Sequence, residues 1–182
     1  MYWVGVLYTT DVQGYCEAVV NTQFNIFEAL EIAERVEGDG ARFYLGVAET
    51  TEDMELRREC YRLANWKAKH SRVIARRRRE YAAKTGEFGT FDPDNYVRSN
   101  PHVMAGLAAP SGRLGRGAAP RCSSRTDLFR RAVAREKETA VFYEGLKHFV
   151  RDPATEAAVE QVLGEEKRYL HSLVDCAQVQ PA

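Results

Sequence analysis

Four stretches of this chain carry apolar residues at intervals of three and four, and in each the apolar stripe is broken near its middle by polar side chains. Such spacing is typical of an amphipathic α-helix whose stripe faces a core. The ionisable residues that break the stripes are Glu37, Lys67 with His70, Glu136 and Glu166. A buried carboxylate is costly unless a cation, a metal ion or hydrogen bonds compensate it. The interruptions therefore predict one shared polar cluster at the centre of a four-helix bundle.

Capping signals set the ends of the four helices. Asn25 and Glu28 have the spacing of a capping box, in which each side chain bonds to the backbone of the other residue. Gly86 is a typical C-terminal stop, and Pro153 after Asp152 suits the first turn of a helix. The helices are therefore expected at about 25–49, 52–84, 124–150 and 153–176.

A long crossover separates the second helix from the third. Residues 86–122 hold six of the thirteen glycines and four of the six prolines, which leaves room for only one short helix, over about 101–109. Two helical hairpins joined in this way resemble the connectivity of a ferritin-like bundle. We therefore expect an all-α, ferritin-like four-helix bundle over 24–178, with its crossover at about 86–123. An N-terminal arm (1–23) precedes the bundle and a short tail (179–182) follows it.

Composition excludes several classes of protein. Lysine plus arginine number 26 and aspartate plus glutamate number 26, a balance that argues against a general binder of nucleic acid or membrane surfaces. No apolar run approaches the ~20 residues that cross a bilayer, and no basic leader precedes the apolar run 2–8. The four cysteines are far apart, which excludes a zinc ribbon or a rubredoxin-type knuckle within this chain. A cytoplasmic protein without disulfides is expected.

The spacing of the polar residues repeats between the two halves of the chain. Seven positions separate Glu37 from Tyr44 and Glu136 from Tyr143, and three separate Lys67 from His70 and Glu166 from Tyr169. The chain thus reads as two copies of one helical hairpin, weakly similar in sequence but equivalent in register.

These motifs carry a resemblance to a known family. The segment FEALEIAERVEGDGARFYLGVAE (27–49) resembles the first helix of the rubrerythrin-like branch of the ferritin-like superfamily. The segments AREKETAVFY (134–143) and GEEKRYL (164–170) resemble that family's second half, and the likeness covers roughly 24–84 and 124–176. In that family each half supplies a Glu from the E-x6-Y helix and an E-x-x-H from the next helix. Together these residues hold two iron ions, which react with peroxide or dioxygen.

The resemblance assigns roles to individual positions. Glu37 and Glu136 match the terminal carboxylates, Tyr44 and Tyr143 match the tyrosines beside them, and His70 and Glu166 match one His and one Glu of the E-x-x-H motifs. The candidate metal ligands are therefore Glu37, His70, Glu136 and Glu166. Two positions depart from the pattern: Lys67 stands where a bridging Glu is expected, and Tyr169 stands where the second His is expected.

The departures change the chemistry that the cluster can support. Because Lys67 and Glu166 occupy equivalent positions, they should meet at the centre, where an ammonium would repel a second cation. Lys67 would then neutralise Glu166, with hydrogen bonds from Tyr169 and Tyr44 completing a core network that also includes Tyr143. We expect no metal. The alternatives are one iron on some of the four candidate ligands, or two metals with Lys67 deprotonated and moved aside.

The resulting expectation is a non-catalytic structural or interaction module that forms a homodimer or a higher homo-oligomer. The alternative is a non-haem iron oxidoreductase that reduces peroxide or dioxygen at a mononuclear or altered site, supplied by a separate electron donor. A third hypothesis is that residues 76–79, four consecutive arginines, dock an acidic partner or RNA rather than forming a solvated helix end.

Remaining polar and glycine positions carry weaker signals. By their spacing, Glu34 and Glu138 are expected either near the site or as acidic residues on the helix surface. Of the other histidines, 102, 148 and 171, only the last could turn inward to replace the missing imidazole. Gly38 and Gly40 cost the first helix about 1 kcal/mol each in helix propensity, which predicts close approach of a neighbouring helix there.

Overall fold

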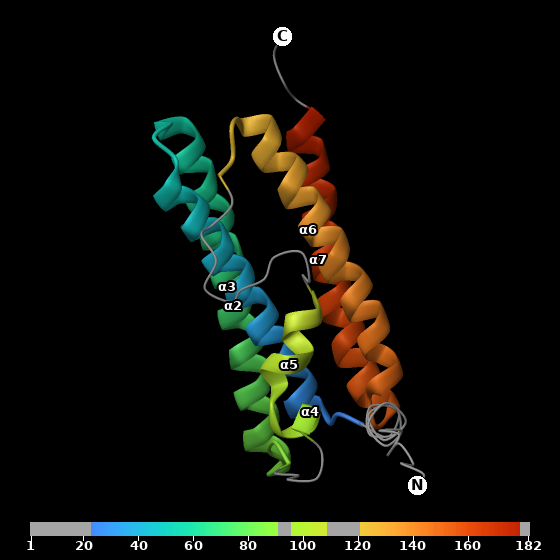
Figure 1. Cartoon of the computed structure of the whole chain (residues 1–182). Coiled ribbons are helices and arrows are strands. Elements are labelled where there is room, and N and C mark those ends of the chain that lie inside the picture. The colour runs from blue at the N-terminus through green and yellow to red at the C-terminus, as the bar shows by residue number, and fades with distance from the viewer. Residues whose placement is uncertain (1–22, 91–95, 109–120, 179–182) are drawn as a thin grey trace, which may run out of the picture.

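A computed structural model of the chain describes residues 23–90, 96–108 and 121–178. This part is all-α, with four long helices in two hairpins that pack against each other (Figure 1). The long helices are α2 (Ile26–Thr50), α3 (Met54–Thr85), α6 (Arg125–Leu146) and α7 (Pro153–Gln178). The shorter elements are α4 (Tyr96–Ser99), α5 (Pro101–Ala105) and two 3₁₀ helices, η1 (Gly106–Ala108) and η2 (Lys147–Phe149). Residues 1–22 of the predicted arm (1–23) and the predicted tail (179–182) lie outside the described residues.

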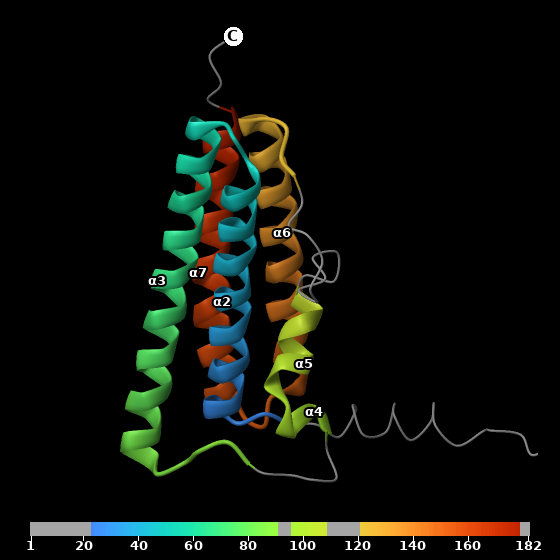
Figure 2. The same ribbon diagram turned by 60° about the vertical axis from the view of Figure 1, so that its left-hand side comes forward.

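Consecutive long helices pair into two hairpins, which form the two halves of the bundle. Helix α2 pairs with α3, and α6 pairs with α7, as the sequence predicted. Helix α3 ends at the opposite end of the bundle from the start of α6, and α4 and α5 of the connection lie on the outside of the bundle (Figure 2). Within that connection α5 packs on α2, and η1 packs on α6.

The capping signals act as predicted. The Asn25 side chain accepts a hydrogen bond from the Glu28 amide at 2.9 Å, and the Glu28 carboxylate accepts one from the Asn25 amide at 3.0 Å. Gly86 has a φ of 71° and closes α3 by donating to the Ala82 carbonyl at 2.9 Å. Asp152 accepts from the Thr155 amide at 2.8 Å at the start of α7. The third helix is shorter than expected, because its last turn tightens into η2.

Two apolar cores lie on either side of the predicted polar centre. The first contains Phe24, Leu30, Ile74 and Val162, together with Met104 from the crossover. The second contains Val47, Leu56, Leu63, Phe129 and Leu173. Since residues 37, 67, 136 and 166 fall between these two sets on their helices, the polar side chains occupy the middle of the bundle.

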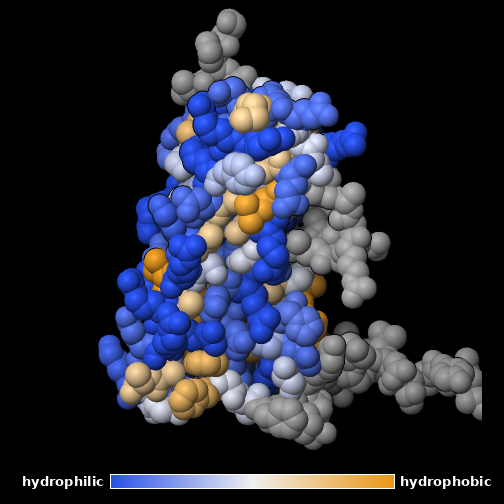
Figure 3. Space-filling view, turned by 90° about the vertical axis from the view of Figure 1, so that its left-hand side faces the viewer, coloured by the Kyte–Doolittle hydropathy of each residue, from blue (hydrophilic) through white to orange (hydrophobic). Residues whose placement is uncertain are grey.

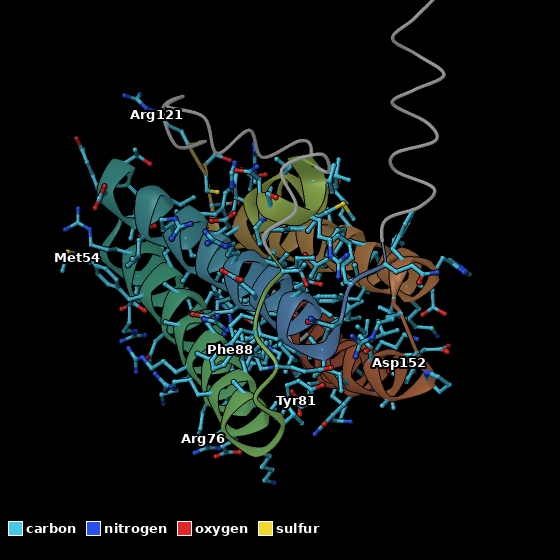
Figure 4. All side chains as sticks on the ribbon, turned by 90° about the horizontal axis from the view of Figure 1, so that it is seen from below. Met54, Arg76, Tyr81, Phe88, Arg121 and Asp152 are labelled. Atoms are coloured by element: carbon cyan, nitrogen blue, oxygen red, sulfur yellow. The ribbon has the colours of Figure 1, made fainter. Side chains whose placement is uncertain are left out.

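The surface of the α2–α3 side is largely hydrophilic (Figure 3). Arg76 lies on the outer side of α3 (Figure 4), where it faces Glu80 one turn further along. In the part of the chain that the structure describes, each helix is too short or too polar to traverse a lipid bilayer.

Candidate functional site

The ammonium of Lys67 lies at the centre of three buried carboxylates. Its Nζ atom is 3.1 Å from Oε2 of Glu37 and 2.6 Å from Oε2 of Glu136. It also contacts both carboxylate oxygens of Glu166, with Oε2 at 3.0 Å. Lys67 is 1% exposed and the three glutamates are 0% exposed. Each of the four long helices contributes one member. Lys67 donates hydrogen bonds to Glu166 and forms ion pairs with Glu37 and Glu136.

A glycine on α2 makes room for the Lys67 side chain. A Cβ atom at Gly40 would lie 3.2 Å from Cδ, 3.3 Å from Cγ and 3.4 Å from Cε of Lys67. The aliphatic stem therefore crosses α2 at this glycine, which confirms the close approach predicted there. Gly38 does not share this role, because its Cβ would meet only Arg42 at 3.7 Å and Ser71 at 4.0 Å, ordinary contact distances.

Replacing Gly40 by valine is expected to lower the free energy of unfolding by about 1–3 kcal/mol, because the added methyl groups displace the Lys67 stem. Gly38→Val is the matched control, with the same change in helix propensity but only ordinary contact distances around its Cβ, and its effect should stay below about 1 kcal/mol. Urea unfolding of both variants measures the difference. Equal effects would contradict the assignment of Gly40 to the Lys67 crossing.

Two tyrosines bind the cluster by reciprocal contacts between the hairpins. The Tyr44 hydroxyl on α2 donates to Oε1 of Glu136 on α6 at 2.9 Å. The Tyr143 hydroxyl on α6 donates to Oε1 of Glu37 on α2 at 3.2 Å. Burial and the neighbouring carboxylate raise the pKa of each tyrosine well above its usual value, so both remain donors. The tyrosine of each E-x6-Y motif thus binds the glutamate of the other motif, which confirms that the two motifs are equivalent in register.

His70 links the buried cluster to the edge of the bundle. Its Nδ1 lies 3.2 Å from Oε2 of Glu37, and its Nε2 lies 2.8 Å from Oε2 of Glu165. Arg77 donates to both oxygens of Glu165, at 2.9 and 2.6 Å. Burial alone would lower the pKa of His70, but the two carboxylates outweigh it and raise that pKa. The contacts with Glu37 and Glu165 therefore favour the protonated form of His70.

Glu165 is the site residue that the sequence reasoning missed. It directly precedes Glu166 and stands one position off the apolar stripe of α7. In the internal repeat Glu165 is equivalent to Trp66, which was not a predicted site residue, so the repeat carried no signal for it. Each of the two contacts the fourth residue of the opposite motif. Trp66 stacks on the ring of Tyr169, whereas Glu165 contacts the His70 ring nitrogen Nε2 through its carboxylate.

Tyr169 contributes a ring to the cluster instead of the predicted hydrogen bond. Its ring stacks on Trp66, with centroids 3.3 Å apart and planes inclined by 6°. The Lys67 ammonium lies 5.5 Å from the Tyr169 ring centroid and 5.3 Å from that of Trp66. The Tyr169 hydroxyl has no hydrogen-bond partner among the residues that the structure describes. The predicted bond is therefore wrong, because stacking fixes the ring in a different orientation.

Burial and neighbouring charges shift the pKa values of Glu37, Lys67 and Glu166. Lys67 and His70 lower the pKa of Glu37 to about 2 although burial alone would raise it. Burial and the charge of Glu37 raise the pKa of Glu166 well above its usual value. Burial alone would lower the pKa of Lys67, but the carboxylates raise it, so the ammonium stays charged. Of Glu37 and Glu166, Glu166 is therefore the one whose protonated form this environment favours.

A metal ion would compete with Lys67 for the same oxygens. Glu37, His70 and Glu166 each place one donor atom within 4.8 Å of the others, while Glu136 stands outside this group of three. Both oxygens of Glu166 and Oε2 of Glu37 contact the ammonium. A cation among these donors would face a like charge at short range in a low-dielectric core. The donor set therefore does not fit a metal while the Lys67 ammonium is inside.

The remaining candidates lie away from the cluster. The side chain of His171 is 81% exposed and 3.7 Å from Asp175, so it does not replace the missing imidazole. His102 and His148 are exposed. Glu34 binds Arg78 at 2.8 Å, and Glu138 lines an apolar groove on α6.

The run of four arginines is divided between two roles. Arg77 is held by Glu165, while Arg78 is held by Glu34 and stacks over the ring of Phe27 at 4.7 Å. Arg76 and Arg79 are exposed. Only half of the run is therefore presented to solvent, which weakens the hypothesis of an arginine docking patch.

No protein-family model, curated protein or solved structure matches this chain.

Proposed function

We propose that this protein is a ferritin-like bundle of the rubrerythrin-like branch in which an ion-pair cluster replaces the metal centre. It would act as a structural or interaction module rather than as an enzyme. One observation carries the proposal: the Lys67 ammonium contacts all three buried carboxylates, including both oxygens of Glu166. The lysine thus supplies, from within the chain, the positive charge that metal ions would bring.

The chemistry of the cluster supports a role in holding the fold. A metal centre that reacts with peroxide or dioxygen needs ionised carboxylates with free lone pairs and an open coordination position. Here Lys67 engages those lone pairs, and tyrosine hydroxyls bind the opposite oxygens of Glu37 and Glu136. A buried network of ion pairs and hydrogen bonds across all four helices favours one arrangement of the helices and one register. The cluster therefore suits a fixed bundle that presents its surface to a partner.

Equilibration of the purified chain with ferrous iron under anaerobic conditions, followed by elemental analysis, tests the proposal. We expect well under one iron per chain, because Lys67 must leave before a cation can bind. Adding dioxygen should produce no visible absorption band. Two irons per chain with an oxo-bridge band would contradict the proposal.

The close group formed by Glu37, His70 and Glu166 favours a second candidate, a non-haem iron oxidoreductase with a single metal ion. This alternative requires Lys67 to withdraw from the cluster and a separate protein to donate electrons. One tightly bound iron per chain, lost in Glu166→Gln, would support it against the first proposal. The family resemblance also favours a homodimer or higher homo-oligomer in the cytoplasm.

A further inference from the structure

An apolar groove runs along the outer face of α6 beside α5 and η1. Its volume is about 500 Å³. Its walls include Met104, Leu107, Val141, Phe142, Leu146 and Phe149. Leu107 is 60% exposed and Val141 is 72% exposed, although both are large apolar residues. Clustered apolar exposure of this kind marks a surface that something else covers.

A glycine in the groove supports the same conclusion. Gly145 lies within α6 and lines the groove, and a Cβ atom there would meet nothing within 4 Å. Gly145 is the second-last residue of α6, where the helix passes into η2, so its cost in helix propensity is below the ~1 kcal/mol of a helix interior. The described contacts of this chain do not require the glycine, whereas close approach of an occupant would.

The start of the described chain lies at one end of the groove. The Phe24 amide donates to the carbonyl of Phe149, a groove residue, at 2.7 Å, and the Arg151 amide donates to the Phe24 carbonyl at 2.9 Å. Phe24 and Val150 form a parallel bridge. Because the pairing is parallel, the chain arriving at Phe24 comes from the side on which Phe149 and α6 lie.

The sequence upstream of Phe24 has the composition that the groove requires. Among the stretches outside the described residues, only 1–22 contains a run of large apolar side chains, YWVGVLY at 2–8. The stretch 109–120 carries a single leucine. Fourteen residues (9–22) separate the run from the described chain and can reach about 46 Å when extended. The groove wall from Lys137 to Phe149 is about 18 Å long, so the tether is sufficient.

We propose that residues 2–8 of this chain bind in the groove of the same molecule and cover Leu107 and Val141. The apolar side chains of the arm would bury the exposed side of α6, and the pairing at Phe24 would direct the arm toward it. This inference does not depend on the ion cluster and stands whether or not a metal binds there.

Disulfide trapping tests the proposal in the full chain. Cys16 and Cys176 are replaced by serine, the buried Cys60 and Cys122 are kept, and Gly5→Cys is combined with Val141→Cys. Mild oxidation should give an intramolecular cross-link in most molecules, seen as a faster band on a non-reducing gel and as the corresponding tryptic peptide by mass spectrometry. The matched control pairs Gly5→Cys with Lys69→Cys, an exposed site on α3, and should give little cross-link.

Each other outcome overturns the proposal. A disulfide-linked dimer would place the arm in the groove of a second copy, and equal trapping at positions 69 and 141 would show no preference for the groove. Trp3→Ser with Leu7→Ser, in the otherwise natural chain, gives an independent measurement. Fluorescence of an apolar dye should rise several-fold when the arm leaves, and unchanged fluorescence would show that residues 109–120 or nothing covers the groove.

Discussion

Replacing Lys67 by methionine is expected to lower the free energy of unfolding by about 3–5 kcal/mol, because removing one partner leaves buried charges uncompensated. Methionine keeps the length of the stem that crosses Gly40, so the change removes the charge with little change in packing. Glu37, Glu136 and Glu166 would lose their shared ammonium in a site closed to water. Urea unfolding at neutral pH measures the loss.

The control for this variant is Lys69→Met, two positions along α3, where the side chain is exposed. It should change the stability by less than about 0.5 kcal/mol. The loss in Lys67→Met should shrink at acid pH, because protonation neutralises the carboxylates that no longer have a cation. A Lys67→Met protein as stable as its control would show that the ammonium does not hold the cluster together.

The sequence predicted those parts of the molecule that depend on local signals and on periodicity. Asn25, Gly86 and Asp152 act at helix ends through neighbours a few residues away, so their roles could be read directly. The interrupted stripes predicted a central polar cluster, because a helix that buries a stripe must bury whatever lies on it. The internal repeat then predicted that Lys67 meets Glu166, which the structure confirms.

The parts that the sequence did not predict depend on contacts between helices. Glu165 stands off the stripe, and only its bond to His70 across the α3–α7 contact brings it into the site. Tyr169 was expected to donate a hydrogen bond, but Trp66 on the facing helix holds its ring in a stack. The orientation of such a side chain depends on packing partners that are distant in the sequence, so it cannot be predicted from the spacing along one helix.

Introducing Lys67→Glu together with Tyr169→His is expected to convert the chain into a metal-binding protein. The double change supplies the fourth carboxylate and the second imidazole, and it removes the ammonium that excludes cations. Arg77 and Glu165 still orient His70 from outside, as partners of metal-bound histidines commonly do. Elemental analysis should rise from well under one iron to about two irons per chain.

Stability gives a second measurement of the same conversion. Without metal the double variant should be less stable than the natural chain, because four carboxylates would then share a core without Lys67. Added ferrous iron should raise its melting temperature strongly, since an ion that binds only the folded state stabilises it by mass action. The natural chain should show no such rise. Tyr169→His alone should gain little metal, because Lys67 remains in place. A double variant that folds yet binds no iron would show that the two hairpins do not hold the geometry of a metal centre, and the proposed relationship to rubrerythrin-like proteins would fail with it.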